Sequence, residues 1–169
     1  MSNFQTGQFV VYPKHGVGKI VGSEVFEVAG HKGEFLIIEY DRGMTLKIPV
    51  ERAKEIGLRL TVSEAEVKRA FSVLRASPRP QMGMWARRSR EIDDKINSGS
   101  LIQICQVLRD LTPRNKSEQG LSYSERNYFD TAMMRATREI SAVRKQDEQK
   151  VRADIEKALK EQAPMIQNA

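Results

Sequence analysis

The side chains best suited to contact a polyanion are concentrated in one short segment, Met84-Trp-Ala-Arg-Arg-Ser-Arg90. Arginine guanidinium groups contact phosphates as rigid planar forks, and they favour narrow minor grooves of DNA. An aromatic side chain beside such arginines can wedge against a base step. The segment therefore predicts DNA contacts from four side chains: Trp85, Arg87, Arg88 and Arg90.

The same residues also fit a purely structural interpretation. Large aromatic side chains are mostly buried in folded proteins, so Trp85 would then be a core residue and the arginines a solvated helix face. Composition and spacing leave both interpretations open. A second basic group lies near the start of a long predicted helix, where loop amides and the helix N-terminus favour phosphate: Arg114, Lys116 and Arg126. Ordinary surface charge explains this second group equally well.

Residues that could support catalysis or bind a metal are sparse and separated. His15 and His31 are the only histidines, and neither has cysteine or carboxylate neighbours at a metal-ligand spacing. No serine or cysteine stands in a recognisable nucleophile motif. Cys105 lies on an apolar helical stripe, which favours a buried structural thiol. We therefore expect no enzyme, no metal and no cofactor.

Two glycines, Gly16 and Gly18, stand in a short glycine motif of the N-terminal part. Phosphate-binding loops need a helix after the glycines, but here a predicted strand follows. The motif is therefore expected to form a turn.

The charge distribution separates the chain into a nearly neutral part and a basic part. Of the 28 Lys and Arg residues, eight lie in residues 1–60, against seven of the 22 Asp and Glu residues. Almost all of the net charge of +6 therefore belongs to the remainder, which indicates a polyanionic partner there. A single cysteine fits a reducing cytoplasm, and no apolar run approaches the roughly 20 residues of a membrane span. We expect a cytoplasmic protein without a membrane partner, and we expect a monomer.

The two parts also differ in the elements that they predict. Residues 8–49 are rich in Val, Ile, Phe and Tyr, and they are divided by turn signals into short strands. From residue 61 the apolar period is helical, with capping boxes at Ser63–Glu66 and Ser122–Glu125. Five helices are predicted, at about 63–77, 82–97, 100–112, 122–145 and 147–162. The third is expected to stop at Pro113.

These elements predict an α+β protein of two domains. Residues 1–58 are expected to form a small all-β domain, a strongly bent barrel or sandwich. Residues 62–162 are expected to form an all-α domain of about five helices.

The stretch Val10–Ile20 resembles the opening of the CarD family of bacterial transcription factors, also called CdnL, and of the RNA-polymerase-interacting module of transcription-repair coupling factors. Further segments resemble the family in its own order: Met44–Pro49, Val73–Arg75, Trp85–Arg88, Ser98-Gly99, Val107–Leu111 and Gly120–Ser122. Together they cover roughly residues 5–160. This extent favours the full-length factor over the isolated coupling-factor module.

The resemblance implies that the N-terminal domain is a Tudor-like module that docks on the β subunit of RNA polymerase. Family members pair one of their strands with an exposed β-subunit strand, which is β-augmentation. Lys47 matches a basic family position at this interface. Another contact position, often arginine in relatives, falls on Phe26 here, so a hydrophobic contact would replace a charge pair.

The resemblance further implies that the helical domain contacts promoter DNA just upstream of the melted region. Trp85 matches the family's minor-groove wedge, with Arg87, Arg88 and Arg90 beside it, and Arg126 matches a basic position that contacts DNA. The expected function is stabilisation of the open promoter complex without strong sequence specificity. The alternative is a free-standing, non-specific DNA-binding architectural protein that needs no polymerase.

Overall fold

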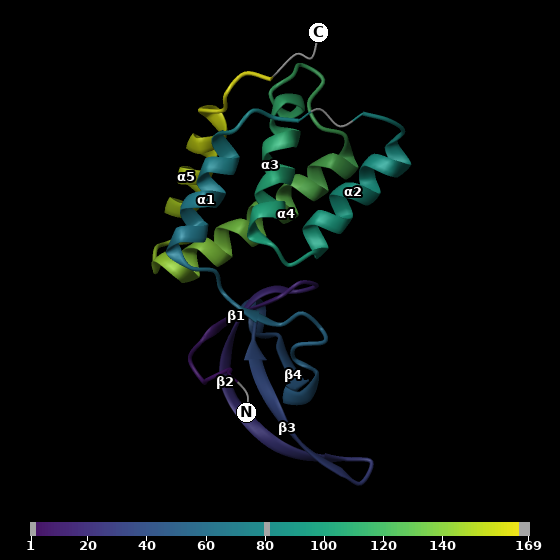
Figure 1. The fold of residues 1–169 in the computed structure, drawn as a ribbon, viewed down its shortest axis with the longest axis vertical. Coiled ribbons are helices and arrows are strands. Elements are labelled where there is room, and N and C mark those ends of the chain that lie inside the picture. The colour runs from purple at the N-terminus through teal and green to yellow at the C-terminus, as the bar shows by residue number, and fades with distance from the viewer. Residues whose placement is uncertain (1–2, 80–81, 166–169) are drawn as a thin grey trace. The chain divides into compact units, whose positions relative to one another are not determined.

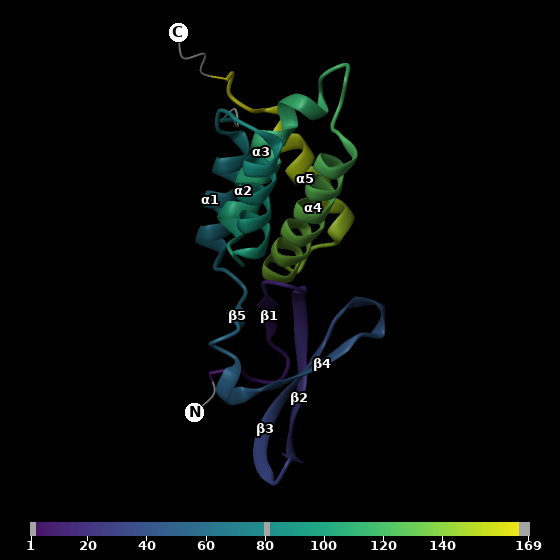
Figure 2. The ribbon, with the colours of Figure 1, turned by 90° about the vertical axis from the view of Figure 1, so that its right-hand side faces the viewer.

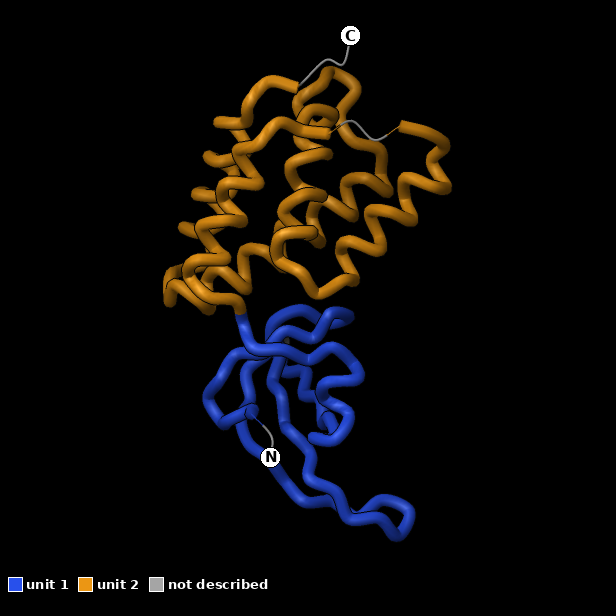
Figure 3. Tube along the Cα trace, viewed as in Figure 1, with its two compact units in different colours: residues 1–61 blue, residues 62–169 orange. Residues whose placement is uncertain are grey.

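The computed structural model describes residues 3–79 and 82–165. It divides into two compact units, residues 1–61 and 62–169 (Figure 3). Unit 1 contains the strands and unit 2 the α-helices (Figure 1). The predicted α+β architecture, with a β domain followed by a helical domain, is confirmed.

Unit 1 is built on one antiparallel sheet with the strand order β4-β3-β2-β1-β5. Its strands are β1 (Phe9–Tyr12), β2 (Gly16–Val28), β3 (His31–Glu39), β4 (Thr45–Pro49) and β5 (Arg59–Leu60). A register shift between Ile20 and Gly22 marks a bulge in β2, which bends the long strand. Beyond the bulge, β2 and β3 continue as a hairpin that projects from the rest of the sheet (Figure 1).

The last strand was not predicted from sequence. β5 pairs antiparallel with β1 through Val10–Leu60 and Val11–Arg59 (Figure 2). Two residues are too few to show the alternating pattern of a strand, so no periodic signal identified β5. Unit 1 runs to Thr61 and therefore includes β5.

The glycine motif serves packing as well as turning, which corrects the sequence-based prediction. Gly16 has a φ of +79° and begins β2 directly after a turn, as expected. Gly18, however, lies inside β2. A Cβ atom there would stand 2.6 Å from Cγ2 of Ile38 and 2.9 Å from the ring of Tyr40, both buried in the core of unit 1. Close approach of a core side chain to the backbone, rather than a turn, requires this glycine.

Unit 2 packs its helices around α3. The helices are α1 (Glu64–Arg75), α2 (Trp85–Asn97), α3 (Leu101–Asn115), α4 (Tyr123–Arg144) and α5 (Glu148–Lys160). α3 contacts each of the other four, and its apolar residues, Cys105 among them, belong to the buried core. No α-helix in the described part of the chain is long and apolar enough to cross a membrane.

Helix α3 does not stop at Pro113, contrary to the prediction, but continues to Asn115. Proline inside a helix leaves the carbonyl four residues earlier without its amide donor. Here that carbonyl belongs to Arg109, and the side-chain Nε2 of Gln162 donates to it at 3.0 Å. A residue 53 positions away in the chain therefore supplies the donor that the proline lacks.

Candidate nucleic-acid interface and β-module surface

Trp85 is the first residue of α2 and is 40% exposed. It is not a member of either buried core cluster. Met82 and Met84 beside it are also strongly exposed. The indole is therefore a partly exposed side chain at a helix start and not a core residue, while its predicted contact with DNA stays a prediction.

The N-terminus of α2 also differs from the other α-helix starts. Side chains cap the other four helices: Ser63, Ser100, Ser122 and Asp147. At α2 the N-cap residue is Met84, which makes no side-chain hydrogen bond, and the first turn contains no acidic residue. The positive end of the helix dipole therefore lies beside Trp85 without a counter-charge in its own turn.

The three predicted arginines of α2 occupy different environments. Arg87 is exposed and pairs with Glu91 at 3.2 Å, one helical turn away. Arg90 is exposed to solvent. Arg88 is only 17% exposed: its Nη2 lies 3.1 Å from Oε1 of Glu125, and its guanidinium carbon lies 5.5 Å from the ring centre of Trp85. Arg88 therefore contacts its own protein on both sides.

Glu125, in the first turn of α4, was not predicted as a site residue. Its side chain is 1% exposed and forms an ion pair with Arg114 at 2.9 Å. It also accepts hydrogen bonds from Arg88 at 3.1 Å and from the backbone N–H of Ser122 at 2.9 Å. The last bond belongs to the predicted capping box, which is confirmed. The capping pattern indicated Glu125, but its two arginine partners come from α2 and α3 and had no signal in the local sequence.

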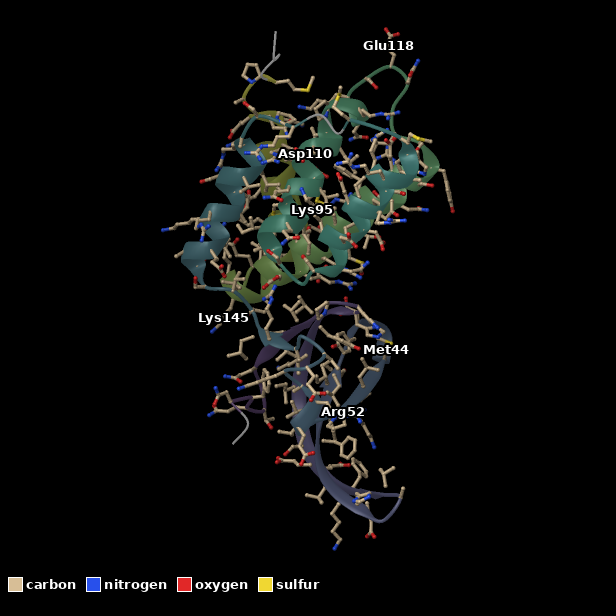
Figure 4. The ribbon with its side chains drawn as sticks, turned by 45° about the vertical axis from the view of Figure 1, so that its right-hand side comes forward. Met44, Arg52, Lys95, Asp110, Glu118 and Lys145 are labelled. Carbon is tan, nitrogen blue, oxygen red and sulfur yellow. The ribbon has the colours of Figure 1, made fainter. Side chains whose placement is uncertain are left out.

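The segment before α2 is held by Asp110, a residue of α3 (Figure 4). Its Oδ1 accepts the backbone N–H of Arg79 at 2.9 Å and lies 2.7 Å from Nε of Arg109. The carboxylate of Asp110 is almost fully buried. The chain is therefore anchored a few residues before Trp85.

Arg126 follows Glu125 in α4 but lines a different surface. It borders a groove of about 300 Å³ between α3, α4 and α5. Its apolar lining comes from Phe129, Met133 and Leu159. Three further cations line it, Lys116, Arg152 and Lys160, together with two carboxylates, Asp130 and Glu156. Arg152 pairs with Glu156, and Nζ of Lys116 donates to the carbonyl of Leu159. Of the predicted DNA-contacting residues, Trp85 and Arg88 are therefore in contact with each other, while Arg126 lies at a separate groove.

In unit 1, the two predicted polymerase-contacting residues lie together. Nζ of Lys47 is 4.1 Å from the ring centre of Phe26, a cation–π contact, and Phe26 packs edge-on against Phe35 at 5.5 Å. Lys47 is in β4, which lies at the edge of the sheet and pairs only with β3 in the described part of the chain. The unpaired edge of β4 therefore lies next to a surface formed by the Lys47 ammonium group and the rings of Phe26 and Phe35.

The side chains that could support catalysis or bind a metal are buried or lie apart in the described part of the chain. Burial raises the pKa of the Cys105 thiol to about 12, which keeps it protonated and unreactive. Within residues 3–79 and 82–165, no group of three or more His, Cys, Asp and Glu residues could hold a metal ion.

Family models match both units of the chain. The model described as CarD, C-terminal domain, matches residues 69–156, and the model described as CarD-like/TRCF RID domain matches residues 4–60. Among individual proteins, "Putative transcription factor YdeB" of Bacillus subtilis (strain 168) is 29% identical over 130 residues, which cover 76% of this chain and 84% of that protein.

Two further similarities concern unit 1. The transcription-repair-coupling factor of Bacillus subtilis (strain 168) is 36% identical over 55 residues, 32% of this chain and 5% of that protein. The solved structure "CdnLNt from Myxoccoccus xanthus" is 38% identical, covers 38% of this chain and 92% of that one, and aligns with a TM-score of 0.32.

The order of the two matched modules defines a transcription factor of two domains. The chain belongs to the CarD family, because the model of the family's C-terminal domain alone matches more than half of it. Unit 1 is the RNA-polymerase-interacting, Tudor-like module that the family shares with transcription-repair-coupling factors.

Proposed function

We propose that this chain docks on the β subunit of RNA polymerase through unit 1 and stabilises the open promoter complex through Trp85 and the cations of unit 2. The observation that carries the DNA part is the exposed indole at the start of α2, beside Arg88 and an uncapped helix N-terminus. A large aromatic side chain presented in this way is suited to contact a partner.

The edge strand β4 supplies the polymerase-binding part of the proposal. Its free side can accept a strand of the partner, with backbone hydrogen bonds for attachment and side chains for selection. Lys47 would meet an acidic side chain there, while Phe26 and Phe35 would meet an apolar one. The cation–π contact keeps the Lys47 ammonium over the Phe26 ring, so charge and apolar surface are presented together.

The DNA-binding part acts by differential binding. Trp85 fills the distorted minor groove at the upstream edge of the bubble, and this groove exists only once the DNA has melted. Only a difference in affinity between open and closed complexes can shift their equilibrium, and about 1.4 kcal/mol corresponds to a tenfold shift. Exposed Arg87 and Arg90 contact nearby phosphates, and the groove at Arg126 offers a second contact.

The attachment of unit 1 to polymerase allows the DNA contacts to be weak. Tethering presents unit 2 to the promoter at a high effective concentration, so its own affinity for DNA need not be large. The alternative of a free-standing architectural protein predicts tight, steeply salt-dependent binding to naked duplex by the factor alone. Titration of a duplex with and without polymerase separates the two, because our proposal requires weak binding alone and recruitment with polymerase.

The DNA contact is tested by Trp85→Ala. This variant should bind polymerase normally and shorten the lifetime of the open complex at a weak promoter, measured after heparin challenge. Tyr123→Ala is a matched control, because Tyr123 is another exposed aromatic residue at a helix start of unit 2. An open complex that lives equally long with Trp85→Ala contradicts the wedge.

The polymerase contact is tested by Lys47→Glu. This charge reversal should weaken binding of the β subunit and leave the circular dichroism of the chain unchanged. Lys54→Glu makes the same charge change at another exposed site of unit 1 and should bind normally. Full binding by the Lys47 variant would place the docking surface elsewhere. A pull-down of the β subunit with residues 1–60 tests whether unit 1 suffices.

A further inference from the structure

The carboxylate of Glu125 in α4 forms ion pairs with arginines of two other helices of unit 2, α2 and α3. It is 1% exposed, and its Oε1 lies 3.1 Å from Nη2 of Arg88 in α2 and 2.9 Å from Nη1 of Arg114 in α3. We propose that Glu125 is a positioning residue, which acts through Arg88 to hold Trp85 in place at the start of α2. The consequence of this inference for transcription rests on the DNA contact proposed above.

Arg88 is the physical link between the buried carboxylate and the indole. Its guanidinium group is planar and offers donors at its edge and a cationic face. The Nη2 atom at the edge donates to Glu125, while the guanidinium carbon lies 5.5 Å from the ring centre of Trp85. One rigid group thus contacts both side chains, so the position of the carboxylate restricts the position of the indole.

The burial of Glu125 makes this arrangement specific. A buried carboxylate is strongly disfavoured without charged partners, and a buried pair loses more when one member is removed than an exposed pair does. The exposed pair between Arg87 and Glu91, on the same helix, can break without leaving a buried charge. The restriction on Trp85 therefore depends on Glu125 and not on the ion pairs of α2 in general.

The two arginines on Glu125 have different exposure and therefore different roles. Arg88 is 17% exposed and Arg114 is 48% exposed. One carboxylate and two guanidinium groups carry a net charge of +1, and the more exposed Arg114 can present that charge to a phosphate. Arg88, predicted from sequence as a phosphate or groove contact, is assigned here as the residue that positions Trp85.

The substitution Arg88→Lys separates these roles. It keeps the positive charge, but an ammonium group lacks the planar fork that reaches Glu125 and the ring together. If Arg88 were a phosphate contact, Arg88→Lys would behave like the original chain. Arg88→Gln would then lower the slope of log affinity against log salt by about 0.9. If Arg88 positions Trp85, Arg88→Lys already releases the indole. The slope of log affinity against log salt then stays unchanged in both Arg88→Lys and Arg88→Gln.

The first measurement uses the intrinsic fluorescence of the full chain without partners. Trp85 is the only tryptophan, so the emission reports on this side chain alone. Glu125→Gln and Arg88→Lys should lower the anisotropy of Trp85 and raise its quenching by acrylamide. Glu91→Gln, the matched control, should leave both at the values of the original chain. Unchanged anisotropy and quenching in a folded Glu125→Gln or Arg88→Lys chain overturns the proposal.

Circular dichroism accompanies these measurements, because Glu125→Gln also alters a buried site. If that variant does not fold, Arg88→Lys decides the question, since Glu125 keeps Arg114 as its partner in that chain.

The second measurement is the lifetime of the open complex. Glu125→Gln and Arg88→Lys should shorten it by about two- to fivefold, the factor that corresponds to a cation–π contact at a partly exposed site. Suppose that Trp85→Ala shortens the lifetime of the open complex. If Glu125→Gln and Arg88→Lys then release the indole without changing this lifetime, the inference that Glu125 supports the DNA contact is overturned. If Trp85→Ala also has no effect, the wedge function fails while the positioning of Trp85 by Glu125 stands.

Discussion

Gly18→Ala should destabilise unit 1, because the added methyl group has no space. Its carbon would stand 2.6 Å from Cγ2 of Ile38 and 2.9 Å from two ring carbons of Tyr40. Ile38 is fully buried and Tyr40 nearly so, and both belong to the core of unit 1. Neither side chain can move away without disturbing its neighbours, so the clash must be relieved by displacing the strand or the core.

The expected cost is about 1–3 kcal/mol, the usual range for an extra methyl group in a packed core. For a domain of about this size, each kcal/mol lowers Tm by about 4–8 °C. Gly22→Ala is the matched control in the same strand. A Cβ there meets nothing within 4 Å, and the backbone is not in the left-handed region. This change should be neutral or slightly stabilising, because alanine restricts the unfolded chain.

Hydrogen exchange of the amides in β2 and β3 measures this effect within unit 1, since a chain of two domains need not unfold in one step. The free energy of exchange should fall by about 1–3 kcal/mol in Gly18→Ala and should not fall in Gly22→Ala. The fluorescence of Trp85, which lies in unit 2, should report the same urea midpoint in both variants. Equal protection of β2 and β3 in the two variants refutes the packing argument.

Three further predictions concern single residues. Ala29 has a φ of +51° at the tip of the β2–β3 hairpin, so Ala29→Gly should stabilise unit 1 by about 1 kcal/mol in urea unfolding. Gln162→Ala should lower the free energy of unfolding by about 0.5–1.5 kcal/mol, because it removes the donor to the Arg109 carbonyl. In a Pro113→Ala chain the backbone amide of residue 113 replaces that donor, so Gln162→Ala should then have no effect. Additive effects of the two substitutions would contradict this explanation. Burial raises the pKa of Cys105 from 9.0 to about 12. The unfolded thiol loses its proton above pH 9 while the buried thiol keeps it, so the free energy of unfolding of unit 2 should be constant below pH 9 and fall as the pH rises towards 12. Urea unfolding at several pH values should show this fall in the original chain, and Cys105→Ala should abolish the contribution of the thiol to it.

The sequence predicted those features that depend on local pattern. Hydrophobic alternation and turn residues predicted the β part, and apolar stripes with capping boxes predicted five helices in the right order. The ordered family segments predicted the family, which the matches to residues 4–60 and 69–156 confirm. Each of these signals lies within a few neighbouring residues, so it can be read without knowledge of tertiary contacts.

Apart from β5, which is too short to show a periodic pattern, the errors and omissions share one cause: the decisive partner lies far away in the chain. Pro113 does not end α3, because Gln162 supplies a donor. Gly18 is required by Ile38, which lies in β3, and by Tyr40, which follows β3 directly. A pattern within one element contains no information about such partners.

The amino-acid sequence by itself determined that this is a CarD-family chain with a nearly neutral β module and a basic helical domain, because composition, periodicity and ordered motifs are properties of the chain. Only the tertiary structure decided the environment of Trp85. It exposes the indole at the start of α2 and sets Arg88 between it and the buried Glu125 of α4. Exposure and ion pairing depend on which helices pack together, and that packing brings residues 88 and 125 within hydrogen-bonding distance.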